Sequence, residues 1–313
     1  MEHKIVISDC DHNDIRMETE VLAGEGLSCD RRKCLSEDEV IAGCADATVL
    51  LVQFARIGAK VIAALPGLKQ VVRYGVGYDN VDIQAAREAG VTVCNVPDYG
   101  MAEVADHAMA MSLCLLRKLR VADAAVRRGS WTYSHTVPIR RIGTLTAGIV
   151  GFGRIGREYA KRMHAFGARI LVTGRRVPET PEYARAVGLE ELLRESDVIS
   201  LHCPSGGNIG MIGPAEFALM KEGTVIVNTA RGGIVDEAAL DKALSSGKLA
   251  GYGLDVALAE PLPADSPLLR HENLVASPHM AWYSEEASRE LKRKVAEEAV
   301  RFIKGRELAY RIC

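Results

Sequence analysis

The chain has 313 residues, in which 39 Lys and Arg stand against 41 Asp and Glu, so its formal net charge is −2. This length suffices for two domains of ordinary size. Because charges of both signs are interspersed and no basic face accumulates, the composition argues against a nucleic-acid-binding protein, and we predict no nucleic-acid partner.

The eight cysteines are scattered without the short spacing of a zinc or redox site, and several lie in apolar runs. We therefore expect reduced thiols and no metal site. The N-terminus lacks a secretory apolar stretch, and the most apolar helix, expected over residues 101–119, carries Glu103, Asp106 and His107. The sequence thus predicts a cytoplasmic protein with no membrane partner.

Strand-like and helix-like runs alternate from the N-terminus onward. Strands are expected over residues 4–8, 47–54, 70–74 and 91–94, with helices over 15–24, 57–65 and 81–89. Such alternation is typical of parallel α/β units. Between the first helix and the second strand, the run Arg31-Arg32-Lys33 is interpreted as a solvated loop.

A second series of strands begins near residue 145 and continues at 168–173, 198–202, 224–228 and 251–255. The predicted fold class is therefore α/β with two doubly wound parallel-sheet, Rossmann-like domains. The boundary is expected near Pro97-Asp98-Tyr99-Gly100, where a proline ends a strand and a long helix starts.

The last segment, residues 284–304, has apolar residues at helical spacing after a serine cap. A lone terminal helix must pack somewhere, and we expect it to return to the N-terminal domain. We therefore predict a discontinuous, flavodoxin-like substrate-binding domain of residues 1–99 plus 284–313, and a dinucleotide-binding Rossmann domain of residues 100–283.

Residues 146–156 read Thr-Ala-Gly-Ile-Val-Gly-Phe-Gly-Arg-Ile-Gly, an apolar run that leads into a glycine loop opening a helix. Such a loop brings backbone N–H groups and a helix N-terminus to a pyrophosphate. A glycine-rich turn without a ligand is the alternative, but the flanking strands and helix favour the nucleotide. The predicted contacts are Gly151, Gly153, Arg154, Ile155 and Gly156.

The end of the following strand reads Gly174-Arg175-Arg176. An Asp or Glu at this place would select NAD by accepting a hydrogen bond from the 2′-hydroxyl of the ribose. Here two guanidinium groups stand where a 2′-phosphate would lie, so the sequence favours NADP, with NAD possible. A solvated loop face is the plainer interpretation of the two arginines.

Three later segments carry polar groups after strands, at the ends where α/β domains bind ligands, and we expect the chemistry between the two domains. They contain Arg231, Glu260 and His279. Hydride transfer to a 2-oxo acid needs a cation for the carboxylate, which Arg231 supplies, and a proton donor, which His279 supplies. A carboxylate such as Glu260 favours the protonated imidazolium.

These motifs together resemble the D-isomer-specific 2-hydroxyacid dehydrogenase family over nearly the whole chain. They are the glycine loop, Asn228-Thr229-Ala230-Arg231-Gly232, Asp255 with Glu260-Pro261, and Ser277-Pro278-His279. The resemblance implies a substrate-binding and a cofactor domain, usually in a homodimer, and Arg231, Glu260 and His279 as the catalytic residues. It also implies further cofactor contacts, at His202, Cys203, Pro204, Thr229, Ala230 and Asp255.

The segment of residues 73–80 resembles the family's substrate loop, in which Arg73, Tyr74, Val76 and Gly77 would bind the substrate, the last two through backbone N–H groups. Within the family, residues 279–285 are similar to the C-terminal-binding proteins, which are dehydrogenase-like corepressors. That likeness places Trp282 over the substrate, with ordinary packing as the alternative.

Two functions follow from these observations. The first is an NADP-preferring oxidoreductase that transfers hydride reversibly between nicotinamide and a 2-oxo acid or D-2-hydroxy acid, with glyoxylate, hydroxypyruvate or a larger acid as substrate. The second is a dinucleotide-sensing, corepressor-like interaction protein. We favour the enzyme, because the sequence shows no long polar tail of the kind expected of a scaffold.

Overall fold

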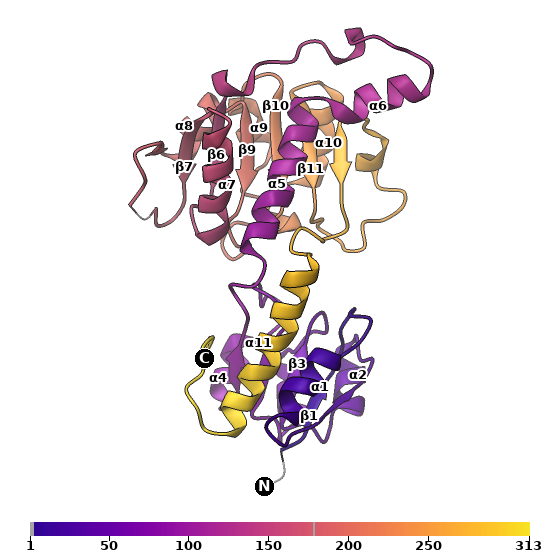
Figure 1. Ribbon diagram of the computed structural model, residues 1–313, viewed down its shortest axis with the longest axis vertical. Helices are drawn as coiled ribbons and strands as arrows, with labels where there is room; N and C mark the ends of the chain where they lie inside the picture. Colours follow the sequence, from indigo (N-terminus) through magenta and orange to yellow (C-terminus); the bar gives the residue numbers. More distant parts are fainter. Residues whose placement is uncertain (1–2, 178) are drawn as a thin grey trace. The chain divides into compact units, whose positions relative to one another are not determined.

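The computed structural model describes residues 3–177 and 179–313. The chain divides into two compact units, Met1–Gly100 with Ser284–Cys313, and Met101–Tyr283 (Figure 1). The described residues form one parallel sheet in each unit, of five strands in the first and seven in the second. The predicted α/β class with two doubly wound parallel sheets is therefore confirmed. None of the helices in the described part of the chain combines the length and the apolar character needed to cross a membrane.

The sheet of the first unit has the strand order β2-β1-β3-β4-β5. Its strands are β1 (Ile5–Ile7), β2 (Cys29–Arg31), β3 (Val49–Val52), β4 (Gln70–Arg73) and β5 (Thr92–Cys94). Its helices are α1 (Arg16–Ala23), α2 (Glu37–Gly43), α3 (Ala59–Ala64), α4 (Ile83–Glu88) and α11 (Glu285–Ile303). Strands β1 and β3 consist entirely of buried Ile, Val and Leu, as expected for parallel strands covered on both faces.

Helix α11 belongs to the first unit although it comes last in the chain. The side chain of Ser284 caps it by accepting a hydrogen bond from the N–H of Ala287 at 2.9 Å. The helix packs against α1 and β4, and the Gln70 side-chain amide donates to the carbonyl of Glu298 at 3.2 Å. Helix α11 thus lies in the same compact unit as the first hundred residues, and this unit is discontinuous in sequence.

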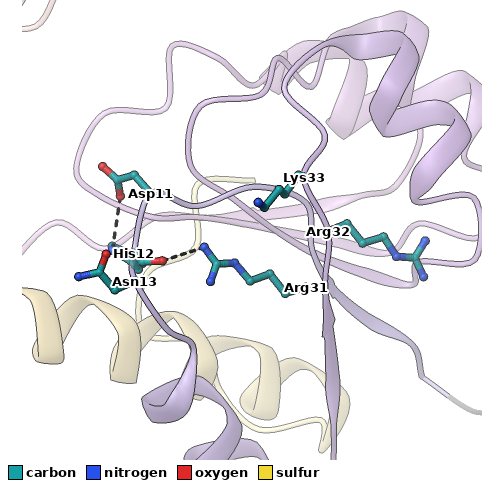
Figure 2. A pocket seen from close by; sticks show the side chains of 6 residues that line it. All are labelled: Asp11, His12, Asn13, Arg31, Arg32 and Lys33. Carbon is teal, nitrogen blue, oxygen red and sulfur yellow. Dashed lines mark hydrogen bonds and ion pairs between the residues drawn. The ribbon is translucent and has the colours of Figure 1, made fainter.

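Two elements of the first unit were not predicted, namely β2 and α2. The prediction of a solvated loop over residues 31–33 is therefore partly wrong, because Arg31 is the last residue of β2. Its guanidinium donates to the carbonyl of His12 at 2.7 Å (Figure 2). Strand β2 escaped prediction because it is a short, largely exposed edge strand without an apolar alternation.

The sheet of the second unit has the strand order β12-β11-β10-β9-β6-β7-β8. Its strands are β6 (Thr146–Val150), β7 (Arg169–Thr173), β8 (Ala184–Ala186), β9 (Val198–Leu201), β10 (Thr224–Asn228), β11 (Leu249–Leu254) and β12 (Leu274–Ala276). Its α-helices are α5 (Met101–Leu116), α6 (Leu119–Arg127), α7 (Arg154–Ala165), α8 (Leu189–Glu195), α9 (Pro214–Leu219) and α10 (Glu237–Ser245). Short 3₁₀ turns are η1 (Ser134–Thr136), η2 (Ile142–Thr144), η3 (Gly232–Ile234) and η4 (Pro267–Arg270).

Apolar cores lie on both faces of this second sheet. Helices α5 and α7 pack against each other over one face, where Ile149, Ile170 and Val225 are buried with them (Figure 1). The other core joins Leu171 and Ile226 to α8, α9 and α10. Strands β6, β7, β9 and β10 are thus covered by apolar packing on both faces of the sheet.

The helix predicted over residues 101–119 is interrupted. It ends at Leu116, and α6 starts at Leu119 after Lys118, whose φ of 51° lies in the left-handed region. A single helix cannot pass through such a residue, so the chain changes direction there.

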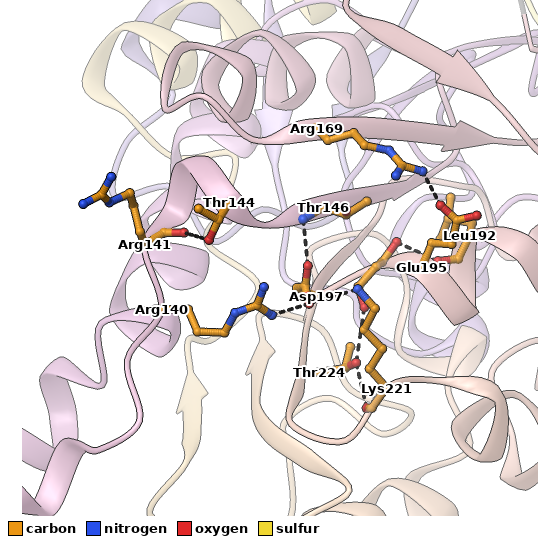
Figure 3. Close-up of polar contacts among 11 residues, drawn as sticks. Arg140, Arg141, Thr144, Thr146, Arg169, Leu192, Glu195, Asp197, Lys221 and Thr224 are labelled. Carbon is orange, nitrogen blue, oxygen red and sulfur yellow. Dashed lines mark hydrogen bonds and ion pairs between the residues drawn. The ribbon is translucent and has the colours of Figure 1, made fainter.

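A buried carboxylate joins the amino ends of three strands in the second unit. Asp197 accepts hydrogen bonds from the N–H of Thr146 at 2.8 Å, from Arg140 at 2.7 Å and from Lys221 at 3.1 Å (Figure 3). Burial alone would raise the pKa of Asp197, but these hydrogen bonds and the Lys221 charge outweigh it, so its pKa lies below the ordinary value.

Candidate active site

The glycine loop lies between β6 and α7. Gly151 has a φ of 98°, and a Cβ there would lie 2.6 Å from the carbonyl carbon of His202. A Cβ on Gly156 would collide with the Gly151 carbonyl oxygen, whereas one on Gly153 would meet nothing within 4 Å. The first and third glycines are therefore required by the fold, and the second leaves open space at the start of the helix.

This loop fits a dinucleotide. Helix α7 begins at Arg154 without a side-chain cap, so the N–H groups of its first turn, where Ile155 and Gly156 lie, can receive a phosphate. Beyond β10, the hydroxyl of Thr229 is buried and has no hydrogen-bond partner within the described residues. A buried hydroxyl of this kind is expected to meet a ligand. The adjacent Ala230 N–H is already bonded to Asn228 at 3.0 Å.

The ribose position after β7 carries no acid. Gly174, Arg175 and Arg176 are exposed, and the Arg175 charge is near enough to act on the pKa of the Cys203 thiol, which burial raises. A Cβ at Gly174 would meet only ordinary contacts, the nearest being the Gly151 Cα at 3.8 Å. The position can therefore accept a side chain.

The backbone of residues 202–204 lies against the glycine loop, since a Cβ on Gly151 would be 2.6 Å from the His202 carbonyl carbon and 2.7 Å from the Cys203 nitrogen. His202 is hydrogen-bonded to the Ser200 hydroxyl at 2.8 Å, and its ring lies 5.3 Å from that of Tyr159. Burial lowers the pKa of His202 to about 3, so the imidazole is neutral. Pro204 is exposed. Of the three, His202 thus serves packing through its side chain, a role that the sequence did not indicate.

Asp255, at the end of β11, organises the loop that follows β12. Its carboxylate is 2% exposed and accepts hydrogen bonds from the Ser277 hydroxyl at 2.6 Å and from the N–H groups of Met280 at 2.9 Å and Ala281 at 3.1 Å. We predicted Asp255 as a cofactor contact, but its side chain faces this loop.

The sequence did not indicate the contact between His107 and Ser277. The His107 Nε2 lies 2.9 Å from the Ser277 hydroxyl and 3.8 Å from the Asp255 carboxylate. In the sequence, His107 is one of several polar residues in the otherwise apolar helix α5. No signal marks its partner, because α5 and β12 meet only in the folded unit.

His279 and Glu260 form a hydrogen-bonded pair in the second unit. The His279 Nδ1 lies 2.6 Å from Glu260 Oε2, and the other carboxylate oxygen accepts from the N–H of Ala257 at 3.0 Å. Burial would raise the pKa of Glu260, but the His279 hydrogen bond and the His279 and Arg231 charges outweigh it, so the pKa lies below its ordinary value. The structure therefore brings Arg231, Glu260 and His279 together, with a charged carboxylate at neutral pH.

The backbone of His279 is unusual. Its φ is 52°, one of two positive values at non-glycine residues in the described part of the chain. Its N–H donates to the Asp255 carbonyl at 2.8 Å, and the Asp255 carboxylate holds the next two N–H groups. Strained backbone is found at functional sites when the surroundings enforce it, as Asp255 does here.

The loop predicted to bind substrate lies in the first unit, after β4. Tyr74 is buried and its hydroxyl donates to Glu18 at 3.0 Å, so its side chain packs the loop and does not face a ligand. Arg73 donates to the Tyr74 carbonyl at 2.5 Å. Val76 is 40% exposed, Gly77 is half-buried, and the Asn95 amide donates to the Val76 carbonyl at 2.7 Å.

Trp282 lies at the end of the second unit, half-buried, with its ring 5.6 Å from that of Tyr283 in an edge-on arrangement. Within the described residues, no group of three His, Cys, Asp or Glu side chains could hold a metal ion.

Comparisons with known proteins show the family to which this chain belongs. A model of the D-isomer specific 2-hydroxyacid dehydrogenase NAD binding domain matches residues 109–281. A D-3-phosphoglycerate dehydrogenase of Archaeoglobus fulgidus is 39% identical over 287 residues, which cover 90% of this chain but 54% of that protein. A glyoxylate reductase of Korarchaeum cryptofilum is 42% identical over 257 residues, 80% of this chain and 77% of that protein.

Among solved structures, a glyoxylate reductase from Paecilomyes thermophila superposes with a TM-score of 0.89 at 32% identity, covering 100% of this chain and 99% of that one. The chain spans about half the length of the phosphoglycerate dehydrogenases that it matches. These relatives are dehydrogenases and reductases, so the finer likeness to the C-terminal-binding proteins is not shown. The chain belongs to the D-isomer specific 2-hydroxyacid dehydrogenase family.

Proposed function

We propose that this chain is an NADP-preferring oxidoreductase that interconverts 2-oxo acids and D-2-hydroxy acids, with glyoxylate or hydroxypyruvate as a substrate. One observation carries the proposal: His279 and Glu260 are hydrogen-bonded at 2.6 Å, and Arg231 is near enough for its charge to lower the pKa of Glu260. A proton donor, its carboxylate partner and a cation are the groups that reduction of a 2-oxo acid requires.

Each residue has a distinct part in the reaction. His279 holds a proton at Nε2 for the substrate oxygen that becomes the hydroxyl, because Nδ1 is engaged by Glu260. Glu260 fixes the ring orientation and stabilises the imidazolium. Arg231 binds the substrate carboxylate, since its guanidinium offers a planar fork of donors.

A bound nicotinamide would supply the hydride, and the residues that would hold the dinucleotide are those of the glycine loop together with Thr229 and Ala230. Gly174 leaves the ribose position without a carboxylate, and Arg175 and Arg176 supply positive charge for a 2′-phosphate. In the first unit, Arg73 and the N–H groups of Val76 and Gly77 remain predicted substrate contacts, as does Trp282 in the second.

The test is NADPH and NADH oxidation against a panel of glyoxylate, hydroxypyruvate and larger 2-oxo acids. The variant His279→Ala should lose turnover with each acid while its NADPH dissociation constant changes less than about threefold, because a proton donor is removed and no nucleotide contact. His164→Ala, at an exposed histidine whose ring stacks on that of Tyr183, is the control. Unchanged turnover in His279→Ala would refute the assignment.

We further propose a homodimer that covers the arm following α6. Trp131 and Tyr133 are 89% and 81% exposed, and Val137 is 60% exposed. Neighbouring apolar side chains at such exposure favour a protein interface. Trp131→Ser with Tyr133→Ser should shift the mass measured by light scattering toward the monomer, and an unchanged dimer mass would show that another surface is used.

The alternative proposal is a dinucleotide-sensing, corepressor-like interaction protein, which the likeness of residues 279–285 to the corepressors supports. The corepressor-like function would be refuted if the protein turned over a 2-oxo acid and if the mass of its oligomer in solution did not change when NADPH was added.

A further inference from the structure

A polar cavity of about 590 Å³ lies at the carboxyl ends of β1 and β2 in the first unit. One wall is the loop of Asp11, His12 and Asn13, and the other is the run Arg31-Arg32-Lys33 (Figure 2). β1 and β2 are neighbouring parallel strands, so their carboxyl ends open on the same edge of the sheet. Loops at that edge are the usual place for ligands in α/β domains.

Positive charge is in excess in this cavity, whose lining holds Arg31, Arg32 and Lys33 against the single carboxylate of Asp11. Arg32 is paired with Asp46 at 2.8 Å and lies 3.6 Å from Asp30, whereas neither Arg31 nor Lys33 has a carboxylate within ion-pair distance in the described part of the chain. In Figure 2 the side chain of Lys33 points toward Asp11, across the cavity, while Arg32 points away from it.

Arg31 is fixed in place by the opposite wall. Its Nη2 donates to the carbonyl of His12 at 2.7 Å and to that of Cys10 at 3.2 Å. Two carbonyl acceptors hold the guanidinium without cancelling its charge, and its remaining N–H groups stay available as donors. A positioned cation of this kind needs no further ordering to bind an anion.

His12 adds a buried polar side chain to the lining. Its side chain is 4% exposed and its Nδ1 lies 3.5 Å from the Asp11 carboxylate. Burial and the charges of Lys292 and Arg31 lower the pKa of His12 to about 4 against the opposing effect of Asp11 and Asp14, so the ring is a neutral hydrogen-bonding group at neutral pH. The neutral ring leaves the positive charge of the lining to the arginines and to Lys33.

We propose that this cavity binds a small hydroxylated phosphomonoester, with its phosphate between Arg31 and Lys33. Two cations match the double charge of a phosphate better than the single charge of a carboxylate. The cavity is larger than a phosphate ion, and the Asp11 carboxylate and Asn13 amide on the other wall suit the hydroxyl groups of an organic part. All these residues belong to the first unit, whereas Arg231, Glu260 and His279 belong to the second.

The cavity is linked to the loop of residues 73–80. The ring of His12 lies 5.4 Å from that of Tyr74 in an edge-on arrangement. The Asp11 N–H donates to the Gln53 side chain at 3.0 Å, and the Asn80 amide reaches the Ala55 carbonyl, two residues further on, at 2.9 Å. Through these contacts, occupancy of the cavity is expected to change the Michaelis constant for the 2-oxo acid, a consequence that rests on the proposed function.

The experiment measures the thermal midpoint of the whole chain with inorganic phosphate and with glycerol phosphate, at constant ionic strength maintained with sodium chloride. Ligand that binds the folded protein raises the midpoint in proportion to RT ln(1 + [L]/Kd). Lys33→Glu should raise the dissociation constants for both probes by about tenfold or more, because it replaces a charge-assisted contact with repulsion. Lys69→Glu is the control, since Lys69 is exposed on the same unit and its side chain forms no hydrogen bond or ion pair with the described residues.

Binding that is lost in Lys33→Glu and kept in Lys69→Glu supports the site. Equal binding in the unsubstituted chain and in both variants overturns the site, and this is the result expected if phosphate binds at the glycine loop instead. An absence of binding in the unsubstituted chain also overturns the site. Glycerol phosphate that binds no tighter than inorganic phosphate overturns the proposed organic part. Because these measurements need no turnover, they remain decisive if no 2-oxo acid is reduced, and an absence of turnover alone would count only against the proposed function.

Discussion

Replacing Asp255 with asparagine tests whether this side chain holds the His279 loop or binds the cofactor. Oδ1 accepts from Ser277 and from the N–H of Met280, whereas the one donor to Oδ2 among the described residues is the N–H of Ala281, at 3.1 Å. An asparagine that keeps its oxygen at Oδ1 places an NH₂ group against the buried Ala281 N–H. A buried donor without an acceptor costs about 1–3 kcal/mol, so Asp255→Asn should lower the free energy of unfolding by about 2 kcal/mol.

The same change should slow turnover. His279 keeps its φ of 52° because the neighbouring N–H groups are anchored, and a left-handed residue costs about 1–3 kcal/mol that a weakened anchor does not offset. A displaced proton donor should lower kcat by about tenfold to a hundredfold. The NADPH dissociation constant should change less than threefold, because the glycine loop is untouched.

Urea denaturation, steady-state kinetics and NADPH fluorescence titration measure these three quantities. Asp82→Asn is the matched control. The Asp82 side chain accepts from the backbone N–H of Ala85 at 2.9 Å, where it caps helix α4, and asparagine caps a helix as well as aspartate does. If Asp255→Asn weakens NADPH binding tenfold while the free energy of unfolding stays unchanged, the carboxylate serves the cofactor and our structural interpretation is wrong.

Three further substitutions address other parts of the second unit. Gly174→Asp should lower the ratio of kcat/KM with NADPH to that with NADH by about tenfold or more through repulsion of the 2′-phosphate; a ratio that does not move would remove the basis for NADP preference. Glu260→Gln should lower kcat by about tenfold with little change in KM, since a half-exposed charge-assisted hydrogen bond is weakened; full activity would exclude the pair from the reaction. Asp197→Asn should cost about 1–3 kcal/mol of unfolding free energy at pH 7. The pKa of Asp197 is lower in the folded than in the unfolded protein, so its contribution to stability is present above about pH 4 and is lost as the pH falls through the folded value. The difference in unfolding free energy between the two proteins, measured in urea, should therefore shrink toward about pH 3. A difference that is constant with pH would contradict the ionic role.

The elements that the sequence predicted well have local causes. The strand expected over residues 224–228 is β10 (Thr224–Asn228), and the helix expected from Arg154 begins there as α7. A continuous apolar run and a glycine turn are sufficient to mark such boundaries. The spacing of apolar residues and the serine cap also predicted a helix over residues 284–304, and α11 spans Glu285–Ile303.

The elements that escaped prediction depend on partners distant in sequence. Strands β2, β8 and β12 have three residues each and lie at the edges of their sheets. An isolated segment this short has no periodicity of its own, and it becomes a strand because an existing edge offers hydrogen bonds. The contact of His107 with Ser277 and the burial of Tyr74 have the same origin, since each requires two elements to meet.

The pair of His279 and Glu260 illustrates this limit. Glu260 is held from the end of β11 through the Ala257 N–H, whereas His279 follows β12, so the 2.6 Å contact between them exists only while these two strands keep their register. That register pairs Leu254 with Ala276, and the Ser277 N–H continues it by donating to the Leu254 carbonyl at 2.8 Å. A shift of one residue would move every side chain of β12 to the opposite face and separate the imidazole from its carboxylate. The sequence therefore shows that a histidine and a glutamate are present, but their contact depends on the pairing of β12 with β11 at the edge of the sheet. The hydrogen bond between Ser277 and Asp255 helps to fix that pairing.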